Sequence, residues 1–354
     1  MKASIRNLPL WIAGTALGLT LSLGGAHADD SVTLRIEHFL PANSNAQQNV
    51  IEPWCEDMKA ASDGRIQCEI YPSMQLGGTP GQLADMARNG VVDVVWTALG
   101  YSAGRFPRSE ALELPFVLPA GGETASRIIW DYSTTYAKDD FKDYKVLAVY
   151  SDGGGTLHTA RKAVRNLDDM KGLRVRASTR LASRFLTSVG ATPVSMPPSQ
   201  IADTLSKGVI DGALAVWEVV PPTKLDETTF YHTTTGPDQA TTTVTTLAML
   251  MNQQRYQGLP DDLKKIVDEY SGEALTVRFG KAWDQAIDQV KNRIAGDDEH
   301  TIITLDAAAY QAMLEASQSV VDDWVASDDG GLDRQALFDG LQKTVKEYTP
   351  ELAR

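Results

Sequence analysis

The sequence has few of the residues that usually carry catalytic or metal chemistry. It contains two cysteines and five histidines in 354 residues. The histidines lie far apart along the chain and form no pair with metal-ligand spacing, which argues against a zinc site. The run Gly153-Gly154-Gly155 is not followed by the lysine that a phosphate-binding loop requires. We therefore expect neither a metal nor a cofactor.

Basic residues are also in the minority. The chain has 33 lysines and arginines against 46 aspartates and glutamates, a net charge of −13. Such an excess of negative charge repels phosphate backbones and anionic lipid headgroups, so it argues against nucleic acid and membrane surfaces as partners. After the first 30 residues, no uncharged apolar run approaches the about 20 residues that a membrane-spanning helix needs.

The N-terminal segment has the pattern of a secretory signal peptide. Lys2 and Arg6 precede the apolar run from Leu8 to Leu23, and Ala26-His27-Ala28 ends it with small residues at the positions that a signal peptidase recognises. We expect cleavage after Ala28 and a soluble, periplasmic mature protein. The alternative is an uncleaved anchor, although the run is short for one.

Cys55 and Cys68 are the only cysteines. In an oxidising compartment such a pair suggests a disulfide. A helical stripe places Cys55 inward and strand alternation places Cys68 inward, toward one helix–sheet layer. Two buried free thiols remain the alternative.

The remaining pattern alternates strands and helices, which predicts an α/β fold with mainly parallel pairing. The chain that remains after the predicted signal peptide is longer than the about 250–300 residues at which single hydrophobic cores stop growing, so two lobes are expected. The predicted strands are 32–38, 65–71, 91–99, 145–150, 172–177 and 209–216, and the predicted helices are 45–61, 80–89, 180–189, 198–207, 261–294 (interrupted at Gly272), 306–327 and 332–348.

One catalytic pattern is present. The stretch Gly100 to Gly104 matches the GxSxG nucleophile elbow around Ser102. An elbow needs a helix directly after the serine, whereas Arg105-Phe106-Pro107-Arg108 contains a proline and has no helical periodicity. A serine hydrolase is therefore kept only as an alternative.

Two segments point to ligand binding instead. In the strand near Val175, Leu173 and Val175 can face the core, which directs Arg174 and Arg176 to the other side. At a strand end in an α/β lobe that side faces the ligand crevice, and a guanidinium matches a carboxylate. A surface ion pair is the alternative for either arginine. The second segment, 208–218, delivers Trp217 at a strand end, where it can cover a ligand or pack in the core.

The chain resembles the DctP family, the substrate-binding proteins of tripartite ATP-independent periplasmic (TRAP) transporters. The resemblance extends over nearly the whole mature chain and keeps the family's order. The stretches that carry it are 71–78 (YPSMQLGG), 90–96 (GVVDVVW), 113–116 (ELPF), 170–176 (MKGLRVR), 190–196 (GATPVSM), 208–213 (GVIDGA) and 259–263 (LPDDL).

The resemblance implies two lobes that close over a ligand and are joined by strand crossings and a long helix. The expected boundaries are 1–28 for the signal peptide, 29–153 plus about 242–281 for lobe I, 154–241 plus about 282–335 for lobe II, and 336–354 for a C-terminal helix. It also implies that Arg176 pairs with the substrate carboxylate.

Three positions depart from relatives of this family. The second arginine of the sialic acid binders is replaced by Thr156, and an asparagine that they place beside the ligand near Ala215 is missing, which argues against sialic acid. Ala98 replaces an acidic residue, which indicates a less polar ligand. The substrate-binding candidates are Phe39, Trp96, Thr97, Tyr101, Thr156, Arg176, Ser178, Pro198 and Trp217.

The aromatic candidates favour an apolar or aromatic acid, or a small hydroxy or keto acid. We therefore predict a monomeric periplasmic receptor, not an enzyme, that delivers a small organic acid to the small and large membrane subunits of a TRAP transporter. The alternative outside transport is a ligand-sensing accessory protein for a membrane kinase.

Overall fold

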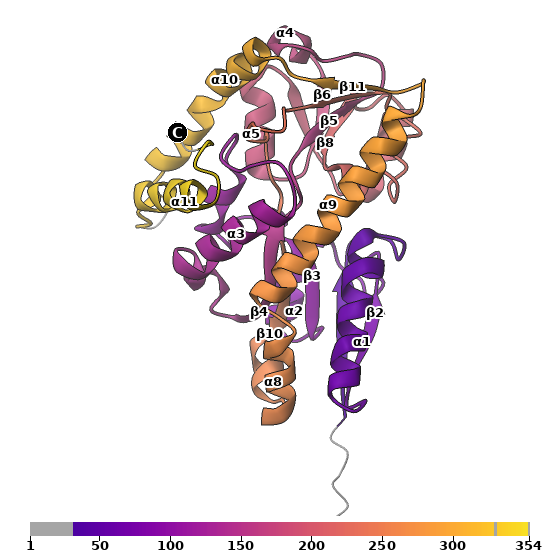
Figure 1. Ribbon diagram of the computed structural model, residues 1–354, viewed down its shortest axis with the longest axis vertical. Coiled ribbons are helices and arrows are strands. Elements are labelled where there is room, and N and C mark those ends of the chain that lie inside the picture. The colour runs from indigo at the N-terminus through magenta and orange to yellow at the C-terminus, as the bar shows by residue number, and fades with distance from the viewer. Residues whose placement is uncertain (1–30, 329–330, 353–354) are drawn as a thin grey trace, which may run out of the picture. The chain divides into compact units, whose positions relative to one another are not determined.

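The computed structural model describes residues 31–328 and 331–352. The predicted signal peptide therefore lies outside the described residues. The chain forms two β-sheets surrounded by helices (Figure 1).

The first sheet has the order β2-β1-β3-β10-β4. Its strands are β1 (Val32–His38), β2 (Ile66–Tyr71), β3 (Val94–Ala98), β4 (Tyr144–Ser151) and β10 (Thr246–Asn252). Every residue of β3 and β10 is buried, which suits central strands covered on both faces. Helix α1 (Glu52–Ala61) packs on β2, α2 (Leu83–Arg88) on β3 and β10, and α3 (Glu123–Thr135) on β4.

The second sheet has the order β11-β9-β5-β8-β6-β7. Its strands are β5 (Thr156–Thr159), β6 (Arg174–Ala177), β7 (Thr192–Ser195), β8 (Gly212–Ala215), β9 (Tyr231–Thr234) and β11 (Thr301–Thr304). Helix α5 (Arg180–Ser188) packs on β6 and β7, and α10 (Ala307–Ala326) packs on α5. Besides the long helix α9, described below, the other α-helices of the described residues are α4 (Leu167–Met170), α6 (Ile201–Ser206), α7 (Gln253–Gln257), α8 (Asp261–Glu269) and α11 (Arg334–Tyr348).

Both sheets are mixed rather than mainly parallel. Strand β10 pairs antiparallel with β3 and β4, and β5 pairs antiparallel with β8 and β9. Each of these strands enters its sheet directly from the other sheet, since the chain passes from β4 to β5 and from β9 to β10. Both strands that follow these direct crossings run antiparallel to their neighbours, so the prediction of mainly parallel pairing was too simple.

The two crossing segments lie side by side and explain the triple glycine. The backbone N–H of Gly155 donates to the carbonyl of Thr243 at 2.8 Å. A Cβ on Gly154 would lie 2.6 Å from Thr241 Oγ1, and Gly154 has a φ of +103°, which side-chain-bearing residues rarely adopt. These glycines therefore let two backbones cross closely.

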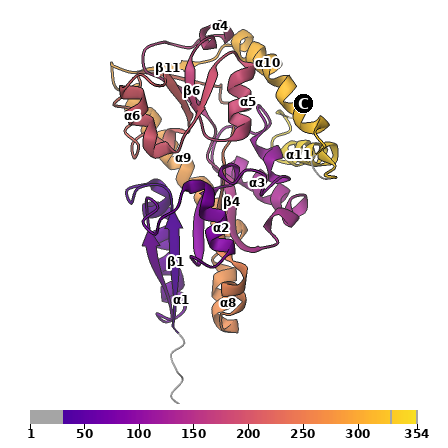
Figure 2. The same ribbon diagram turned by 180° about the vertical axis from the view of Figure 1, so that it is seen from behind.

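Helix α9 (Glu273–Ala295) runs past both sheets (Figures 1 and 2). It packs on α3 and β4 at one end and on β11 at the other. Near its middle, a Cβ on Gly280 would lie 2.7 Å from Glu123 Cα. The Asp284 carboxylate accepts the backbone N–H groups of Gly122 and Glu123 at 2.5 and 2.8 Å. At its far end, Arg293 pairs with Asp226 at 2.7 Å.

The disulfide joins helix α1 to strand β2. Cys55 and Cys68 are bonded, with their Cα atoms 5.9 Å apart and a sequence separation of 13. By the chain-entropy argument, closing so short a loop stabilises the fold by about 3 kcal/mol. The helix before Cys55 begins as the π-helical turn η1 (Ala46–Ile51) and becomes α1 where Pro53 occupies the first turn.

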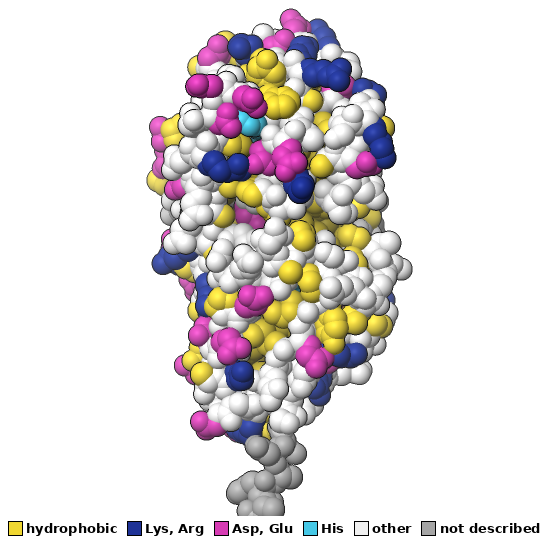
Figure 3. Space-filling model, turned by 90° about the vertical axis from the view of Figure 1, so that its right-hand side faces the viewer, with side chains coloured by type: hydrophobic (Ala, Val, Ile, Leu, Met, Phe, Trp, Pro, Cys, Tyr) yellow, Lys and Arg dark blue, Asp and Glu magenta, His cyan; other side chains and the backbone are white. Residues whose placement is uncertain are grey.

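The surface carries charges of both signs. Figure 3 shows acidic and basic side chains interspersed over the face that it presents, with uncharged side chains between them. Within residues 31–328 and 331–352, no helix combines the length and the apolar character that crossing a membrane would require.

Candidate functional site

A cavity lies where the two sheets meet at the crossing segments. It leaves about 50 Å³ for the centres of water molecules, several times the roughly 10–15 Å³ that a single buried water needs. This suits a small ligand. The lining residues come from both sheets and from the crossings: Phe39, Leu40, Trp96, Tyr101, Asp152, Gly155, Arg176, Ser178, Pro198, Leu214, Ala215, Val216, Glu218, Val219, Thr243, Thr245 and Leu247.

Arg176 is the one arginine or lysine in this lining. It lies in β6 and is 3% exposed. Its Nε donates to the carbonyl of Met196 at 3.1 Å, and its Nη1 donates to the carbonyl of Leu214 at 3.3 Å. Its Nη2 has no hydrogen-bond partner among the described residues. Two backbone carbonyls thus hold the guanidinium in place at the cavity wall, next to Tyr101, and leave Nη2 without a partner of hydrogen-bond geometry among the described residues.

Arg174, two residues earlier, has a different environment. Its Nε and Nη2 donate to the two carboxylate oxygens of Asp211 at 2.9 and 2.8 Å, and its side chain is 44% exposed. This is the surface ion pair expected as the alternative for either arginine. Of these two arginines, only Arg176 is buried and lines the cavity.

One wall of the cavity is aromatic. The rings of Phe39 and Trp96 are stacked with their centroids 4.8 Å apart and their planes 8° apart, and Tyr101 meets Phe39 edge to face. Trp96 Nε1 donates to the Tyr150 hydroxyl at 2.6 Å, which fixes the indole. Flat apolar surfaces of this kind suit a flat ligand.

Two buried carboxyl groups also face the cavity. Burial raises the pKa of Asp152 to about 6. Hydrogen bonds from Gly154 and Thr245 and the charge of Arg176 act in the opposite direction but do not cancel this effect. Burial, reinforced by Asp152, raises the pKa of Glu218 to about 8. Near neutral pH, Glu218 is therefore mainly a neutral carboxylic acid, because low dielectric surroundings disfavour its charged form.

Six of the nine substrate-binding candidates line the cavity. They are Phe39, Trp96, Tyr101, Arg176, Ser178 and Pro198. Thr97, Thr156 and Trp217 are buried but are not among the lining residues. Thr156 starts β5 directly after the lining residue Gly155, and the Thr97 hydroxyl donates to the carbonyl of Ala98 at 3.4 Å.

The sequence interpretation did not single out Asp152, Glu218 or the threonines of the second crossing as lining residues. Asp152 follows the apolar strand β4 and precedes the triple glycine, while Glu218 lies in the helical turn η7 (Trp217–Val219) after β8. The run Thr241-Thr242-Thr243 followed by Val244-Thr245 is an unusual composition that could have marked the crossing.

Trp217 packs against histidines instead of the cavity. Its ring centroid lies 5.0 Å from that of His158 and 5.1 Å from that of His232. His158 Nδ1 and His232 Nδ1 are 2.7 Å apart, and His232 Nε2 is 3.0 Å from His300 Nδ1. We call His158, His232 and His300 the histidine chain. Strand pairing of β5 with β9 aligns the first two, although 74 residues separate them in the sequence.

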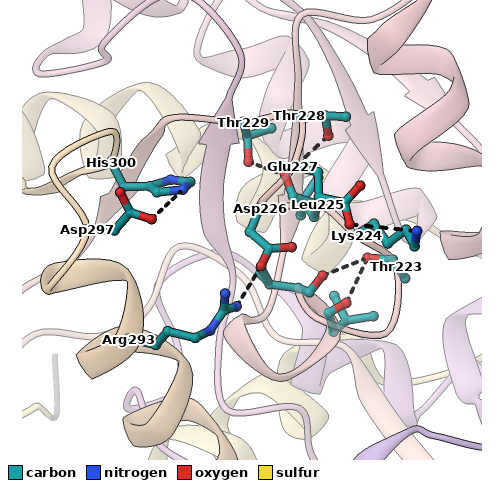
Figure 4. Close-up of polar contacts among 12 residues, drawn as sticks. Thr223, Lys224, Leu225, Asp226, Glu227, Thr228, Thr229, Arg293, Asp297 and His300 are labelled. Atoms are coloured by element: carbon teal, nitrogen blue, oxygen red, sulfur yellow. Dashed lines mark hydrogen bonds and ion pairs between the residues drawn. The ribbon is translucent and has the colours of Figure 1, made fainter.

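The histidine chain runs from the interior to the turn after α9. Figure 4 shows its outer end, where His300 faces Asp297 and Arg293 pairs with Asp226 of the 223–229 loop. Burial, with a contribution from His300, lowers the pKa of His232 to about 4, and burial lowers the pKa of His158 further below its usual value. No group of three or more metal-ligating side chains suited to a metal ion occurs within the described ranges.

Ser102 does not line the cavity with Arg176. Its hydroxyl donates to the backbone carbonyl of Gly81 at 3.1 Å. The serine follows the short turn Leu99–Tyr101 rather than preceding a helix, so the GxSxG stretch does not form a nucleophile elbow here.

The chain has two β-sheets flanked by helices and joined by two crossing segments, with a buried arginine at the cavity where the sheets meet. This arrangement is that of a two-lobed solute-binding protein. The model of family 7 of the bacterial extracellular solute-binding proteins, DctP, matches residues 36–328. The chain therefore belongs to this family. The predicted family and the predicted two-lobed α/β fold class are both confirmed.

Solved structures of similar proteins include several with bound acids. A marine metagenome TRAP solute-binding protein from an unidentified microbe, specific for aromatic acids and bound to 3-hydroxybenzoate, is 40% identical, with a TM-score of 0.86 over 90% of this chain and 99% of that one. A protein from Rhodoferax ferrireducens with copurified benzoate is 39% identical, with the same TM-score and coverage. One from Bordetella bronchiseptica with bound mandelate is 26% identical, with a TM-score of 0.80 over 89% and 99%.

Proposed function

We propose that this chain is a periplasmic receptor that binds an aromatic monocarboxylate in its cavity and delivers it to the membrane subunits of a TRAP transporter. The observation that carries the proposal is the buried Arg176, whose Nη2 has no partner among the described residues. A buried guanidinium with an open donor calls for an anionic group, and a carboxylate matches its planar geometry.

The rest of the cavity supports a ring-bearing ligand. Phe39 and Trp96 offer stacked apolar surfaces at the cavity, which suit a flat ring. The relatives with the highest identity reported above bind aromatic acids. Small hydroxy or keto acids would leave much of this aromatic surface uncovered, so we rank them below aromatic acids.

Binding would stabilise a closed arrangement of two lobes, with residues 29–153 and about 242–281 in the first and residues 154–241 and about 282–335 in the second. Arg176 belongs to the second lobe, and Phe39, Trp96 and Tyr101 belong to the first. A ligand that contacts both lobes binds the closed form more tightly, so it shifts the population toward that form. Residues 1–28 would direct secretion as a signal peptide, and no catalytic role is assigned to the chain.

The test uses the mature protein, freed of copurified ligand, and measures thermal unfolding and calorimetric binding with benzoate, 3-hydroxybenzoate and mandelate. Benzamide and benzyl alcohol serve as uncharged controls. An acid present at 100 to 1,000 times its Kd stabilises the protein by about 2.7–4.1 kcal/mol. This raises Tm by several degrees, and the uncharged compounds should give no shift.

Arg176→Ala should weaken binding of these acids by at least about 100-fold, because removing one partner of a buried ion pair costs about 3–5 kcal/mol. Arg174→Ala is the matched control, since Arg174 lies on the same strand but pairs with Asp211 at the surface. It should bind as the wild type does. Tight binding by folded Arg176→Ala, or no binding of any acid by the wild type, would contradict the proposal.

A further inference from the structure

Glu218 is a buried acid in the cavity wall that the carboxylate–arginine pair does not explain. Its side chain belongs to η7 and the residue is 4% exposed. One of its oxygens, Oε1, is fully buried and has no hydrogen-bond partner among the described residues. A buried polar atom without a partner is costly, and here the open atom belongs to a residue that lines a cavity with room for a ligand.

Arg176 and Glu218 come from different elements, β6 and η7. The guanidinium donates to the carbonyls of Met196 and Leu214 and forms no ion pair with Glu218 among the described residues. A ligand carboxylate that pairs with Arg176 therefore leaves Glu218 to a different group of the ligand.

The protonation state of Glu218 determines what that part can be. With a pKa of about 8 the group is mainly a neutral carboxylic acid near neutral pH. A neutral carboxyl has one O–H donor and retains acceptor capacity. A hydroxyl group has the complementary donor and acceptor, whereas an aromatic C–H has neither.

We propose that Glu218 is a specificity-determining residue that hydrogen-bonds a hydroxyl group carried by the ligand away from its carboxylate. The receptor then prefers hydroxylated aromatic monocarboxylates over the unsubstituted acids. This inference rests on the proposed function, since it assumes that Arg176 holds the carboxylate. The preference arises because the unsubstituted ligand leaves Oε1 buried without a partner, whereas the hydroxylated ligand satisfies it.

The experiment measures Kd by calorimetry for benzoate, 3-hydroxybenzoate, 4-hydroxybenzoate and 3-hydroxyphenylacetate. The proteins are the ligand-free wild type, Glu218→Leu, Glu218→Gln and the control Glu227→Gln, whose carboxylate pairs at the surface with Lys224. The wild type should bind at least one hydroxylated acid about tenfold or more tightly than benzoate, a difference that one well-placed hydrogen bond can supply.

Glu218→Leu should abolish this preference while benzoate affinity changes by less than about threefold, and Glu227→Gln should keep it. Glu218→Gln, which also offers a donor and an acceptor, should retain part of the preference and shows whether loss in the leucine variant reflects hydrogen bonding or folding. Thermal unfolding checks that each variant is folded.

Three outcomes would overturn the inference. Benzoate bound as tightly as every hydroxylated acid would show that water satisfies Oε1, and the proposed function would stand. An equal loss for benzoate and its hydroxylated analogues in both Glu218 variants would show that Glu218 only shapes the cavity. Failure of the wild type to bind any aromatic acid would remove the proposed function and this inference together.

Discussion

The cavity and the histidine chain are two clusters of buried titratable side chains, and they differ in where their unpartnered atoms lie. In the cavity, Arg176 Nη2 and Glu218 Oε1 belong to residues that line open space. In the histidine chain, each ring lies within hydrogen-bond distance of the next, and the unpartnered His158 Nε2 belongs to a residue outside the cavity lining. An unpartnered buried atom indicates a ligand only where there is room for one.

Burial also moves the pKa values of the two clusters in opposite directions. It raises those of Asp152 and Glu218 and lowers those of His158 and His232, because in each case the neutral form is favoured. The cavity and the histidine chain should therefore give opposite contributions to the pH dependence of stability.

The largest expected effect concerns Glu218. Its folded pKa of about 8 exceeds the ordinary value of 4.5, so between these pH values the folded state keeps a proton that the unfolded state releases. Its contribution to stability is present below pH 4.5 and is lost as pH rises toward 8, by several kcal/mol at about 1.4 kcal/mol per pKa unit. In urea unfolding at pH 5 and pH 8, Glu218→Gln should lose less stability than the wild type. Equal losses would refute the assignment, and Glu227→Gln should match the wild type.

A smaller effect of opposite sign is expected for His232. Its folded pKa of about 4 lies below the ordinary 6.5, so the unfolded state binds more protons between these values. The contribution of His232 is present above pH 6.5 and is lost as pH falls toward 4, by about 3 kcal/mol. His232→Gln should flatten the fall in unfolding free energy between pH 6.5 and pH 4.5, whatever its effect at neutral pH. An unchanged slope would mean that the ring is not kept neutral.

The smallest effect links Asp152 to ligand binding. The pKa of Asp152 is about 6, and the charge of Arg176 is one of the influences that keep it from being higher. A ligand carboxylate bound at Arg176 neutralises that charge and adds a like charge near Asp152. Binding should therefore raise the pKa of Asp152 and take up a proton above pH 6. The affinity for benzoate should fall with rising pH, at most about tenfold per unit. Calorimetry in buffers of different ionisation enthalpy measures the uptake, and Asp152→Asn should reduce it. A benzoate affinity of the wild type that does not change with pH would contradict this coupling.

Apolar patterning predicted the elements with strong periodicity. The strand 32–38 agrees with β1, and the helix 180–189 agrees with α5 within one residue. The sequence interpretation did not include β5, β9 and β11, because each has four residues rich in threonine, histidine or isoleucine without a longer alternation. Strand β10 was also not identified, since its leucine, alanine and methionine residues suit a helix equally well.

The site was predictable only in part for a related reason. Arg176 follows from alternation along one strand and from the family resemblance. The burial of Asp152 and Glu218 depends instead on how two crossings and a helical turn meet, which no local pattern reports. The histidine chain depends on strand order, because β9 lies between β5 and β11. The members of both clusters lie far apart in the sequence, so no local pattern indicated that they meet.

Helix α9 has a consequence for any movement between the two sheets. At 23 residues it is about 35 Å long. It is clamped to α3 by the Gly280 contact and the Asp284 carboxylate, and it is tied at its far end by Arg293. The two sheets are therefore linked through α9, and any change in their relation has to bend or twist this helix or break contacts that it makes.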